Sequence, residues 1–396
     1  MAPRRWYTVT AGMDLRTALV TLRLRHPFGL SRGTVSELPS LLVRLDPGDP
    51  DGAAADGPDR RGLGEAAPVR YLGQSAAAAA PLAVAIAAEL APEILTDPRA
   101  ITAAGARMRE LAPAHSAARC AVDTALWDAA ARARGLPLAE LLADPDVLDR
   151  AGLDRHVLSA TSGAAVTSYT IALDELPAMA ARAAAAAHLP VLKIKLGKDR
   201  DFDRAAARAV AAAAPRARLR VDANGGWTPD DVRDLLPLLV DLGVEQLEQP
   251  LPAGRPDLLA ALARDCPLPI YADEDVQGPA DVAALRGRVA GINVKLMKCG
   301  GISPALAMIA AARENGLRVL VGCMIESRVG LAAGAALARL ADEADLDAHM
   351  LTRADPMPPG SQERLAPDLP RLCGPGLGVP PGALPADGDP EPARVA

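Results

Sequence analysis

The feature that most constrains the fold is a series of eight short apolar segments that recur about every 25 residues from residue 166 onward. Alanine-rich helical sequence fills most of the intervals, as at 203–214, 228–241 and 303–315. The strand candidates are 166–171, 191–196, 218–222, 244–248, 269–273, 291–296, 318–323 and 343–347. Eight strands, each followed by a helix or a loop, predict an α/β fold of the (β/α)8 TIM type. The rival architecture is a doubly wound sheet, which needs a glycine-rich phosphate turn that this sequence lacks.

The first 160 residues follow a different pattern, with strand-like and helical segments mixed. Segments 17–30 and 38–46 alternate like the strands of a small sheet, joined through 31–37. Segment 115–142 has helical periodicity, interrupted at Gly135 and Pro137. This part of the sequence therefore predicts an α+β domain that would cap the barrel.

The length of 396 residues exceeds what one ordinary core requires, so we expect more than one unit. The predicted division is a capping domain at 1–160, a barrel at 161–354, and a proline-rich segment at 355–396. We expect the last segment to pack back on the cap and its final dozen residues to be disordered. The Pro/Gly/Asp-rich stretch 47–61 should be a mobile loop.

Composition excludes several classes of protein. The net charge is −6 and acids are interspersed with bases, which argues against a nucleic-acid partner. The most apolar run, 76–88, is too short to span a membrane and contains Pro81, and the N-terminus lacks the apolar core of a signal peptide. The five cysteines show no paired spacing, which indicates reduced thiols and a cytoplasmic location.

Three carboxylates follow three consecutive strand candidates: Asp222, Glu248 and Asp273, which are 26 and 25 residues apart. Because the carboxyl ends of barrel strands meet at one rim, these side chains should lie together. Such a cluster repels itself unless it holds a cation, and an all-oxygen ligand set favours Mg²⁺, with Mn²⁺ as the alternative. One acid at a strand end often only caps the next helix, but three in succession make that the weaker interpretation.

Lys193 and Lys195 lie within one apolar strand candidate and point to the same face of it. Lys295 lies in the sixth strand candidate, half-way round an eight-stranded barrel from the second. Lys195 and Lys295 should therefore face each other across the barrel mouth, with the acids on the arc between them. Paired lysines often simply extend to solvent from a strand end, but that does not explain the lysine opposite.

This arrangement suits proton transfer at a carbon beside a carboxylate. A substrate carboxylate on the metal ion would hold its α-carbon between two amines, one removing the proton and the other returning one to the opposite face. The metal ion stabilises the negative charge that develops. Lys193, as a neighbouring cation, would favour the neutral amine that Lys195 needs to act as a base. The pattern predicts a racemase or an epimerase.

The eighth strand candidate contributes Asp345 and Asp347, which alternate onto one face. They lie too far round the barrel to bind the same metal ion, and they would suit a cationic group of the substrate, such as a free ammonium. Segment 341–348 is acidic throughout, so the residues alone equally allow a solvated acidic loop.

Together these motifs resemble the enolase superfamily, in particular its muconate-lactonizing-enzyme subgroup. The matching motifs are KIK at 193–195, DAN at 222–224, EQP at 248–250, DED at 273–275 and NVKLMKCGG at 293–301. Segments 62–68 and 116–128 resemble the capping domain of that superfamily. The resemblance implies Mg²⁺ on the three carboxylates, an acid–base pair of Lys195 and Lys295, and assembly into a homo-oligomer.

Within the subgroup, the chain is most similar to the dipeptide epimerases of the L-Ala-D/L-Glu type. TSYT at 167–170, GCMIES at 322–327 and DLD at 345–347 carry this similarity. It implies that the two aspartates hold the α-ammonium of a dipeptide. The other substrate contacts that it implies are Thr170, Cys323, Ile325, Asn224 and, for the distal carboxylate of a glutamate side chain, Arg32.

Two departures from the family pattern are visible. Asp275 stands where the family usually has serine and would add an acid near the metal rim, and the loop at 47–61 is longer than usual. Lys298 is expected to be structural, because strand alternation would turn it away from Lys295.

Dipeptide epimerisation at the C-terminal α-carbon is the leading hypothesis, and other functions stay open. o-Succinylbenzoate synthase and muconate cycloisomerase need no ammonium site, and N-succinylamino acid racemase acts on a blocked amine. The seventh strand candidate contains no histidine, which disfavours the mandelate-racemase subgroup. A barrel that only binds a ligand is the alternative from another class, and the complete set of lysines and acids argues against it.

Overall fold

A parallel eight-stranded sheet forms the larger part of the computed structural model, which describes residues 13–47, 60–154, 166–357, 374–382 and 384. The strands pair in chain order from β4 to β11. They are β4 (Tyr169–Ile171), β5 (Val191–Lys195), β6 (Arg218–Asp222), β7 (Val244–Glu248), β8 (Ile270–Ala272), β9 (Gly291–Lys295), β10 (Arg318–Gly322) and β11 (Glu343–Asp345). Every strand lies within a predicted segment, and a parallel bridge from Thr167 to Ala344 joins the last strand to the first. The predicted barrel is confirmed.

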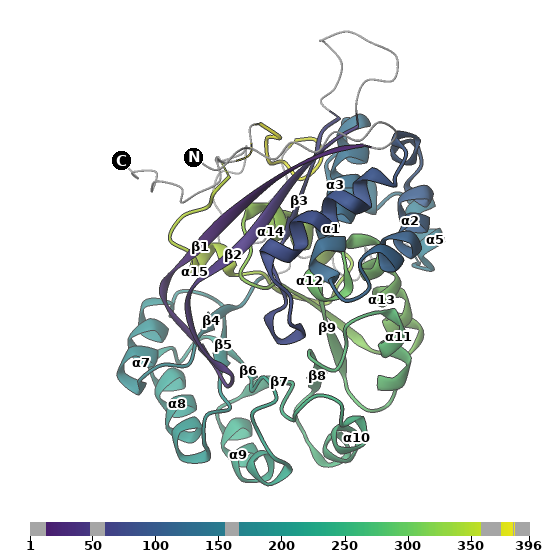
Figure 1. Cartoon of the computed structure of the whole chain (residues 1–396). Coiled ribbons are helices and arrows are strands. Elements are labelled where there is room, and N and C mark those ends of the chain that lie inside the picture. Colours follow the sequence, from purple (N-terminus) through teal and green to yellow (C-terminus); the bar gives the residue numbers. More distant parts are fainter. Residues whose placement is uncertain (1–12, 48–59, 155–165, 358–373, 383, 385–396) are drawn as a thin grey trace.

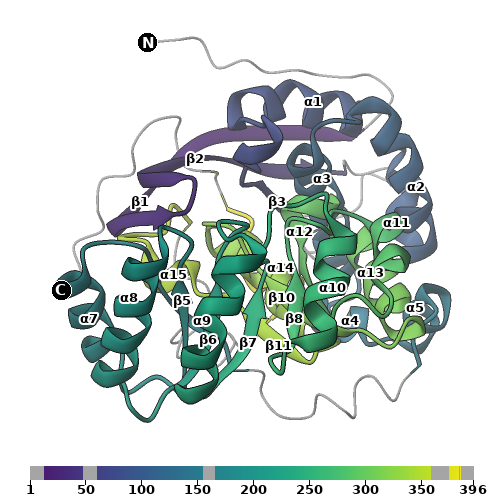
Figure 2. The same ribbon diagram turned by 90° about the horizontal axis from the view of Figure 1, so that it is seen from below.

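Helices surround the strands on the outside, as Figures 1 and 2 show. They are α7 (Leu176–Ala185), α8 (Arg200–Ala213), α9 (Pro229–Asp241), α10 (Pro256–Asp265), α11 (Pro279–Val282) with η3 (Ala283–Leu285), α12 (Leu296–Cys299), α13 (Ile302–Glu314), α14 (Arg328–Ala338) and α15 (Ala348–Leu351). Their starts follow local sequence: Thr228 and Asp231 form a capping box at α9, and the Asp199 carboxylate accepts from the Phe202 N–H at α8.

The N-terminal part is an antiparallel three-stranded sheet covered by helices. Its elements are β1 (Asp14–Leu30), β2 (Gly33–Asp46), β3 (Gly62–Ala66), η1 (Arg70–Leu72), α1 (Ala76–Ala88), η2 (Pro92–Thr96), α2 (Pro98–Leu111), α3 (Ser116–Ala133), α4 (Leu138–Leu142) and α5 (Pro145–Ala151). The break between α3 and α4 falls at Gly135 and Pro137, as predicted. None of the described helices combines the length and apolarity that a membrane span requires.

The β1–β2 hairpin is longer than the sequence indicated. Segment 31–37 was expected to connect two strands, but pairing continues up to Leu30 and Gly33, and only Ser31 and Arg32 form the turn. Gly33 has φ of 128°, a conformation that favours glycine and permits this tight reversal. Figure 1 shows the hairpin reaching from the cap helices to the barrel, where Ser31 Oγ donates to the Asn224 carbonyl.

The described part of the C-terminal segment lies against α3 and its neighbours. The Leu377 N–H donates to Asp128 Oδ1 at 2.7 Å, and Arg132 donates to the Val379 carbonyl. Arg44 of β2 donates to the Gly382 carbonyl at 2.7 Å. The expected domain division stays a prediction, because its boundary falls in 155–165, outside the described residues. Most of the loop at 47–61 and all of the last dozen residues also lie outside them.

Candidate active site

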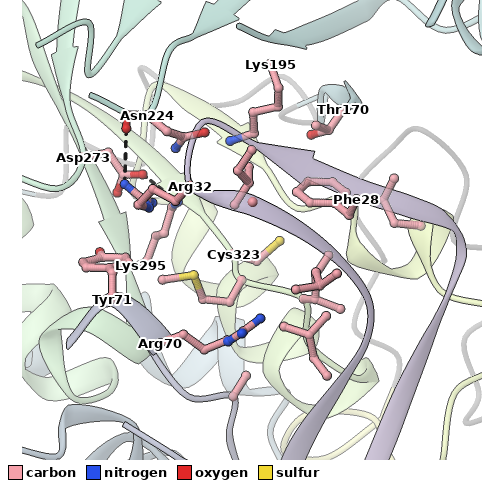
Figure 3. Close-up of a pocket in the computed structure, with 18 of the residues that line it drawn as sticks. Phe28, Arg32, Arg70, Tyr71, Thr170, Lys195, Asn224, Asp273, Lys295 and Cys323 are labelled. Carbon is pink, nitrogen blue, oxygen red and sulfur yellow. Dashed lines mark hydrogen bonds and ion pairs between the residues drawn. The ribbon is translucent and has the colours of Figure 1, made fainter. Parts of the chain in front are cut away.

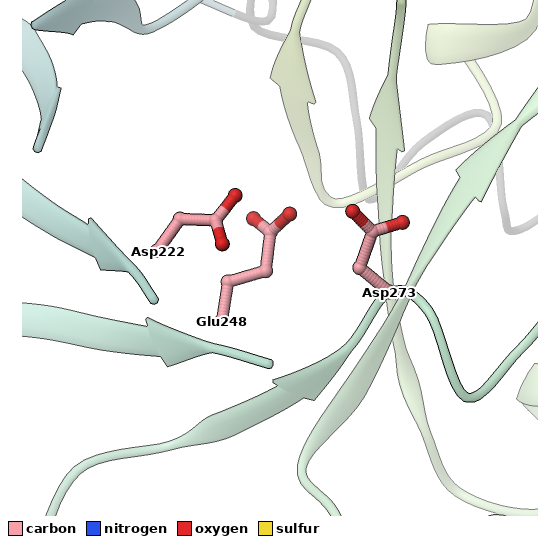
Figure 4. A group of neighbouring side chains, drawn as sticks. All are labelled: Asp222, Glu248 and Asp273. Atoms are coloured by element: carbon pink, nitrogen blue, oxygen red, sulfur yellow. The ribbon is translucent and has the colours of Figure 1, made fainter. Parts of the chain in front are cut away.

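Three acidic side chains meet at the carboxyl ends of β6, β7 and β8 (Figure 4). Asp222 and Glu248 end their strands, and Asp273 follows β8 directly. One oxygen from each lies within 4.8 Å of the others, and none of the three residues is more than 2% exposed. Burial, with Asp222 beside it, raises the pKa of Glu248 to about 7. An all-oxygen cluster that repels itself in this way fits a divalent cation such as Mg²⁺.

Lys193 lies between this cluster and the strand-eight aspartates. Its Nζ is 2.8 Å from Glu248 Oε2, 2.7 Å from Asp345 Oδ2 and 3.0 Å from Asp222 Oδ2. Burial opposes the charged amine, but the three carboxylates prevail and raise the pKa of Lys193 well above its ordinary value. Lys193 is therefore a permanent cation beside Lys195, and its tuning role stays a prediction.

Lys195 and Lys295 enter the site from β5 and β9, with the three acid-bearing strands between them in the sheet. Lys195 Nζ donates to Asp222 Oδ2 at 2.6 Å, and Lys295 Nζ donates to Asp273 Oδ2 at 2.8 Å. Both lysines line the pocket that Figure 3 shows. The two amines thus border the acidic cluster at its two ends, as the strand positions predicted.

Strand alternation does not describe Lys298, because the strand ends before it, and its assignment as a structural residue stays a prediction. Residues 296–299 form the single-turn helix α12, which turns this lysine back toward Asp273. Lys298 Nζ lies 2.5 Å from Asp273 Oδ1 and 2.6 Å from the Asp273 carbonyl, and it also contacts the carbonyls of Val276 and Asn293 at 3.0 Å. Asp273 is therefore held by a different lysine on each carboxylate oxygen.

Asp345 and Asp347 are both buried, so the solvated acidic loop is excluded. Asp345 accepts from Ser168 Oγ at 2.5 Å and from Lys193, and Asp347 accepts from the Thr170 N–H at 2.6 Å. Burial would raise the pKa of Asp345, but Lys193 lowers it. Burial and the neighbouring Asp345 raise the pKa of Asp347 to about 6, so both side chains are mainly ionised at neutral pH.

The three lysines of β5 and β9 and the two strand-eight aspartates line a cavity of about 410 Å³ under the tip of the β1–β2 hairpin. The cavity is also lined by Thr170, Asn224, Cys323 and Ile325, all of them predicted site residues. In Figure 3, Phe28 and Thr170 lie on the side away from Asp273 and Lys295. The structure thus brings every predicted lysine, every strand-eight aspartate and the predicted contact residues to one pocket.

Arg32 also lines this pocket, but it is engaged by protein groups. Its Nη1 donates to Glu274 Oε1 at 2.7 Å and to the Asn224 carbonyl at 3.2 Å. Its guanidinium lies 4.9 Å from the centre of the Tyr71 ring. The sequence analysis did not single out Glu274 or Tyr71, because nothing local relates either of them to Arg32.

Asp275 is not one of the three converging acids, and its effect on the metal rim stays a prediction. Its carboxylate accepts from Gln249 Nε2 and from the Gly254 N–H, each at 2.6 Å. The residue beside it, Glu274, is the one of the two that lines the cavity. The aspartate in place of the usual serine therefore binds the loop after β7.

Comparison with known families supports the assignment suggested by this geometry. Residues 175–382 match the family described as Enolase C-terminal domain-like, and residues 13–143 match the N-terminal domain of mandelate racemase / muconate lactonizing enzyme. The chain belongs to the enolase superfamily. The family resemblance drawn from the motifs is confirmed.

Several relatives of this superfamily member are dipeptide epimerases. A hydrophobic dipeptide epimerase of Roseobacter litoralis is 37% identical over 87% of this chain and 92% of its own. An L-Ala-D/L-Glu epimerase of Bacteroides thetaiotaomicron is 31% identical over 88% of this chain and 83% of its own. The structure of a Cytophaga hutchinsonii dipeptide epimerase, complexed with Mg and D-Ala-L-Val, is similar with a TM-score of 0.80 at 26% identity, covering 94% of this chain and 97% of that one.

Proposed function

We propose that this chain is a Mg²⁺-dependent isomerase that epimerises dipeptides at the α-carbon of the C-terminal residue. The observation that carries the proposal is the pair of buried lysines, Lys195 and Lys295, at opposite ends of a cluster of three carboxylates. The dipeptide epimerases among its relatives support the substrate class, and one of them was crystallised with Mg and a dipeptide.

Asp222, Glu248 and Asp273 would hold the metal ion, since their oxygens converge and no nitrogen or sulfur ligand is among them. When bound, Mg²⁺ would supply positive charge to the substrate carboxylate while the α-carbon is deprotonated. Lys195 and Lys295 donate to two of these acids, so they lie beside the place where the substrate carboxylate would bind.

Lys195 and Lys295 would exchange the proton. One Nζ takes the α-proton of the bound stereoisomer, and the other Nζ, already protonated, delivers a proton to the opposite face. The roles reverse for the other stereoisomer. Lys193 keeps its own proton because three carboxylates surround it, so it acts only as a fixed positive charge.

Asp345 and Asp347 would bind the free α-ammonium of the dipeptide. Their negative charges are buried, and burial without a nearby cation is unfavourable. Lys193 compensates Asp345, whereas Asp347 accepts from the neutral Thr170 N–H. This imbalance favours a cationic substrate amine over the blocked amine of an N-succinylamino acid and over the cycloisomerase substrates.

Solvent deuterium exchange tests the proposal directly. With Mg²⁺ in D₂O, a library of L,L-dipeptides should include members that gain deuterium at the C-terminal α-carbon, seen by mass shift. Lys195→Ala and Lys295→Ala should each lower epimerisation by about 10³-fold, the usual scale for a lost acid or base. Each variant should keep exchange from one stereoisomer only, since one base survives.

The matched control is Lys198→Ala, which removes an exposed lysine that lies over the Phe202 ring. It should leave the exchange rate unchanged. Chelation should abolish activity in all active forms, and Mg²⁺ or Mn²⁺ should restore it. Normal epimerisation by both lysine variants would exclude the two-base scheme.

We further propose that the enzyme works in the cytoplasm as a homo-oligomer. The four described cysteines are all free, which agrees with a reducing compartment. Light scattering coupled to size-exclusion chromatography measures the oligomeric state, and a monomeric mass would contradict the second part of this proposal.

A further inference from the structure

Arg32 occupies the turn of the β1–β2 hairpin and lines the cavity. An arginine without protein partners at this place would attract an acidic side chain of the substrate. Here the Glu274 side chain is 5% exposed and pairs with Arg32 at 2.7 Å. The Tyr71 ring and the Asn224 carbonyl hold the same guanidinium. The arginine is therefore part of an internal ion pair.

The pair is asymmetric, and this asymmetry decides how it responds to a substrate. Arg32 is 40% exposed, whereas Glu274 is buried, and its other side-chain hydrogen bond comes from the neutral amide of Asn224. Drawing the guanidinium toward a substrate carboxylate would leave Glu274 as a buried charge without its ion-pair partner, which is unfavourable. Arg32 is thus bound more firmly than its exposure alone suggests.

Glu274 also acts on the cavity itself. Its Oε2 has no hydrogen-bond partner among the described residues, although it is buried. The negative charge of Glu274, a residue that lines the cavity, offsets the attraction of Arg32 for a second carboxylate. The other arginine of the lining, Arg70, is exposed, so solvent screens its charge. The wall beside Arg32 therefore presents no strong attraction for an anion.

The remaining wall is largely apolar. The hairpin contributes Phe28, Leu30, Val35 and Leu38, and the segment after β10 contributes Met324 and Ile325. Such a surface gains free energy when it buries an apolar group and loses it when it desolvates a charge.

We propose that Glu274 neutralises Arg32 and that the site consequently selects dipeptides with apolar side chains over acidic ones. This inference rests on the proposed epimerase function and names the substrate class of that site. Glu274 is the specificity-determining residue, and Arg32 is the cation that it keeps from the substrate.

The test compares kcat/KM for L-Ala-L-Leu and L-Ala-L-Glu in the wild type and in Glu274→Gln. The wild type should prefer L-Ala-L-Leu. Glu274→Gln keeps the shape, releases the charge of Arg32, and should shift the ratio toward L-Ala-L-Glu by about tenfold, as expected for one partly screened ion pair. The double variant Arg32→Met/Glu274→Gln should lose that gain. Using the ratio cancels any change in metal binding common to both substrates.

Asp275→Asn is the matched control, because it removes the same charge from the next residue, whose carboxylate binds Gln249 and Gly254. Its ratio should equal that of the wild type. A wild-type preference for L-Ala-L-Glu, or an unchanged ratio in Glu274→Gln, would overturn the inference while leaving epimerisation intact. Absence of α-proton exchange with every dipeptide would instead overturn the proposed function and this inference together.

Discussion

At the scale of single residues, Asp273 is the most constrained of the three acids. Lys295 holds its Oδ2 and Lys298 its Oδ1, and the same Lys298 ammonium also contacts three backbone carbonyls. An acid fixed on one oxygen presents the other in a defined direction. Lys298 is therefore placed to orient a proposed metal ligand, while its positive charge opposes the binding of a cation.

Replacing Lys298 separates these two effects. If orientation dominates, Lys298→Met and Lys298→Arg should both weaken Mg²⁺ binding by about tenfold or more, the usual cost of losing a partner of a metal ligand. Isothermal titration with Mg²⁺ measures this without reference to activity, and circular dichroism shows whether each variant is folded. Tighter Mg²⁺ binding by the folded Met variant would mean that charge repulsion is the larger effect.

The sequence predicted those site residues whose positions follow from strand ends. Asp222, Glu248 and Asp273 are regularly spaced, and the barrel repeat alone brings them together. Glu274 was missed because its partner, Arg32, is 242 residues away and lies on a hairpin whose path depends on how the cap packs. Lys298 was missed because a one-turn helix has too few residues to show a period.

At the scale of elements, β3 lies unusually close to α3. A Cβ added at Gly64 would lie 1.8 Å from the Ala121 carbonyl oxygen, and one at Gly62 would lie 1.9 Å from that of Ala125. Gly62 and Gly64 lie two residues apart on the same face of β3. Ala121 and Ala125 lie about one helical turn apart on α3, so each glycine meets one alanine carbonyl. The close contact fixes the position of Glu65, the residue that follows, over the barrel.

Gly64→Ala should therefore destabilise the protein by about 3 kcal/mol, the upper range for overpacking, because backbone must move. Gly105→Ala is the control: this glycine is inside α2 with only the flexible Arg109 side chain nearby, at 3.6 Å. It should stabilise the protein by about 0.5–1 kcal/mol through helix propensity. Urea unfolding followed by circular dichroism measures both, and equal stability of the two variants would contradict the close-packing argument.

At the scale of the whole molecule, Glu65 connects the cap to the barrel. It accepts from the Ser327 N–H and Gly330 N–H at the start of α14, each at 3.0 Å, and from the hydroxyls of Ser327 and Ser40. Glu326 is buried close by, and both carboxyl groups approach Gly330. No sequence pattern relates Glu65 to residues that lie 262 positions away or more, so this junction could not be predicted.

The junction should make stability depend on pH. Burial, followed by the charge of Glu65, raises the pKa of Glu326 from 4.5 to about 8. Between these values the folded chain holds a proton that the unfolded chain has released. The contribution of Glu326 to stability is therefore complete below pH 4.5, declines as the pH rises, and is lost above about pH 8.

Glu326→Gln keeps an uncharged group of the same shape at every pH, so it should remove this decline. At pH 9 its Tm should exceed that of the wild type by about 2–5 °C, whereas at pH 5 the two should be similar. Glu314→Gln, which changes an exposed glutamate at the end of α13, should follow the wild-type curve. Differential scanning calorimetry from pH 5 to 9 measures the curves. Parallel curves for Glu326→Gln and the wild type would show that Glu326 is already ionised in the folded protein, and that the junction holds two negative charges.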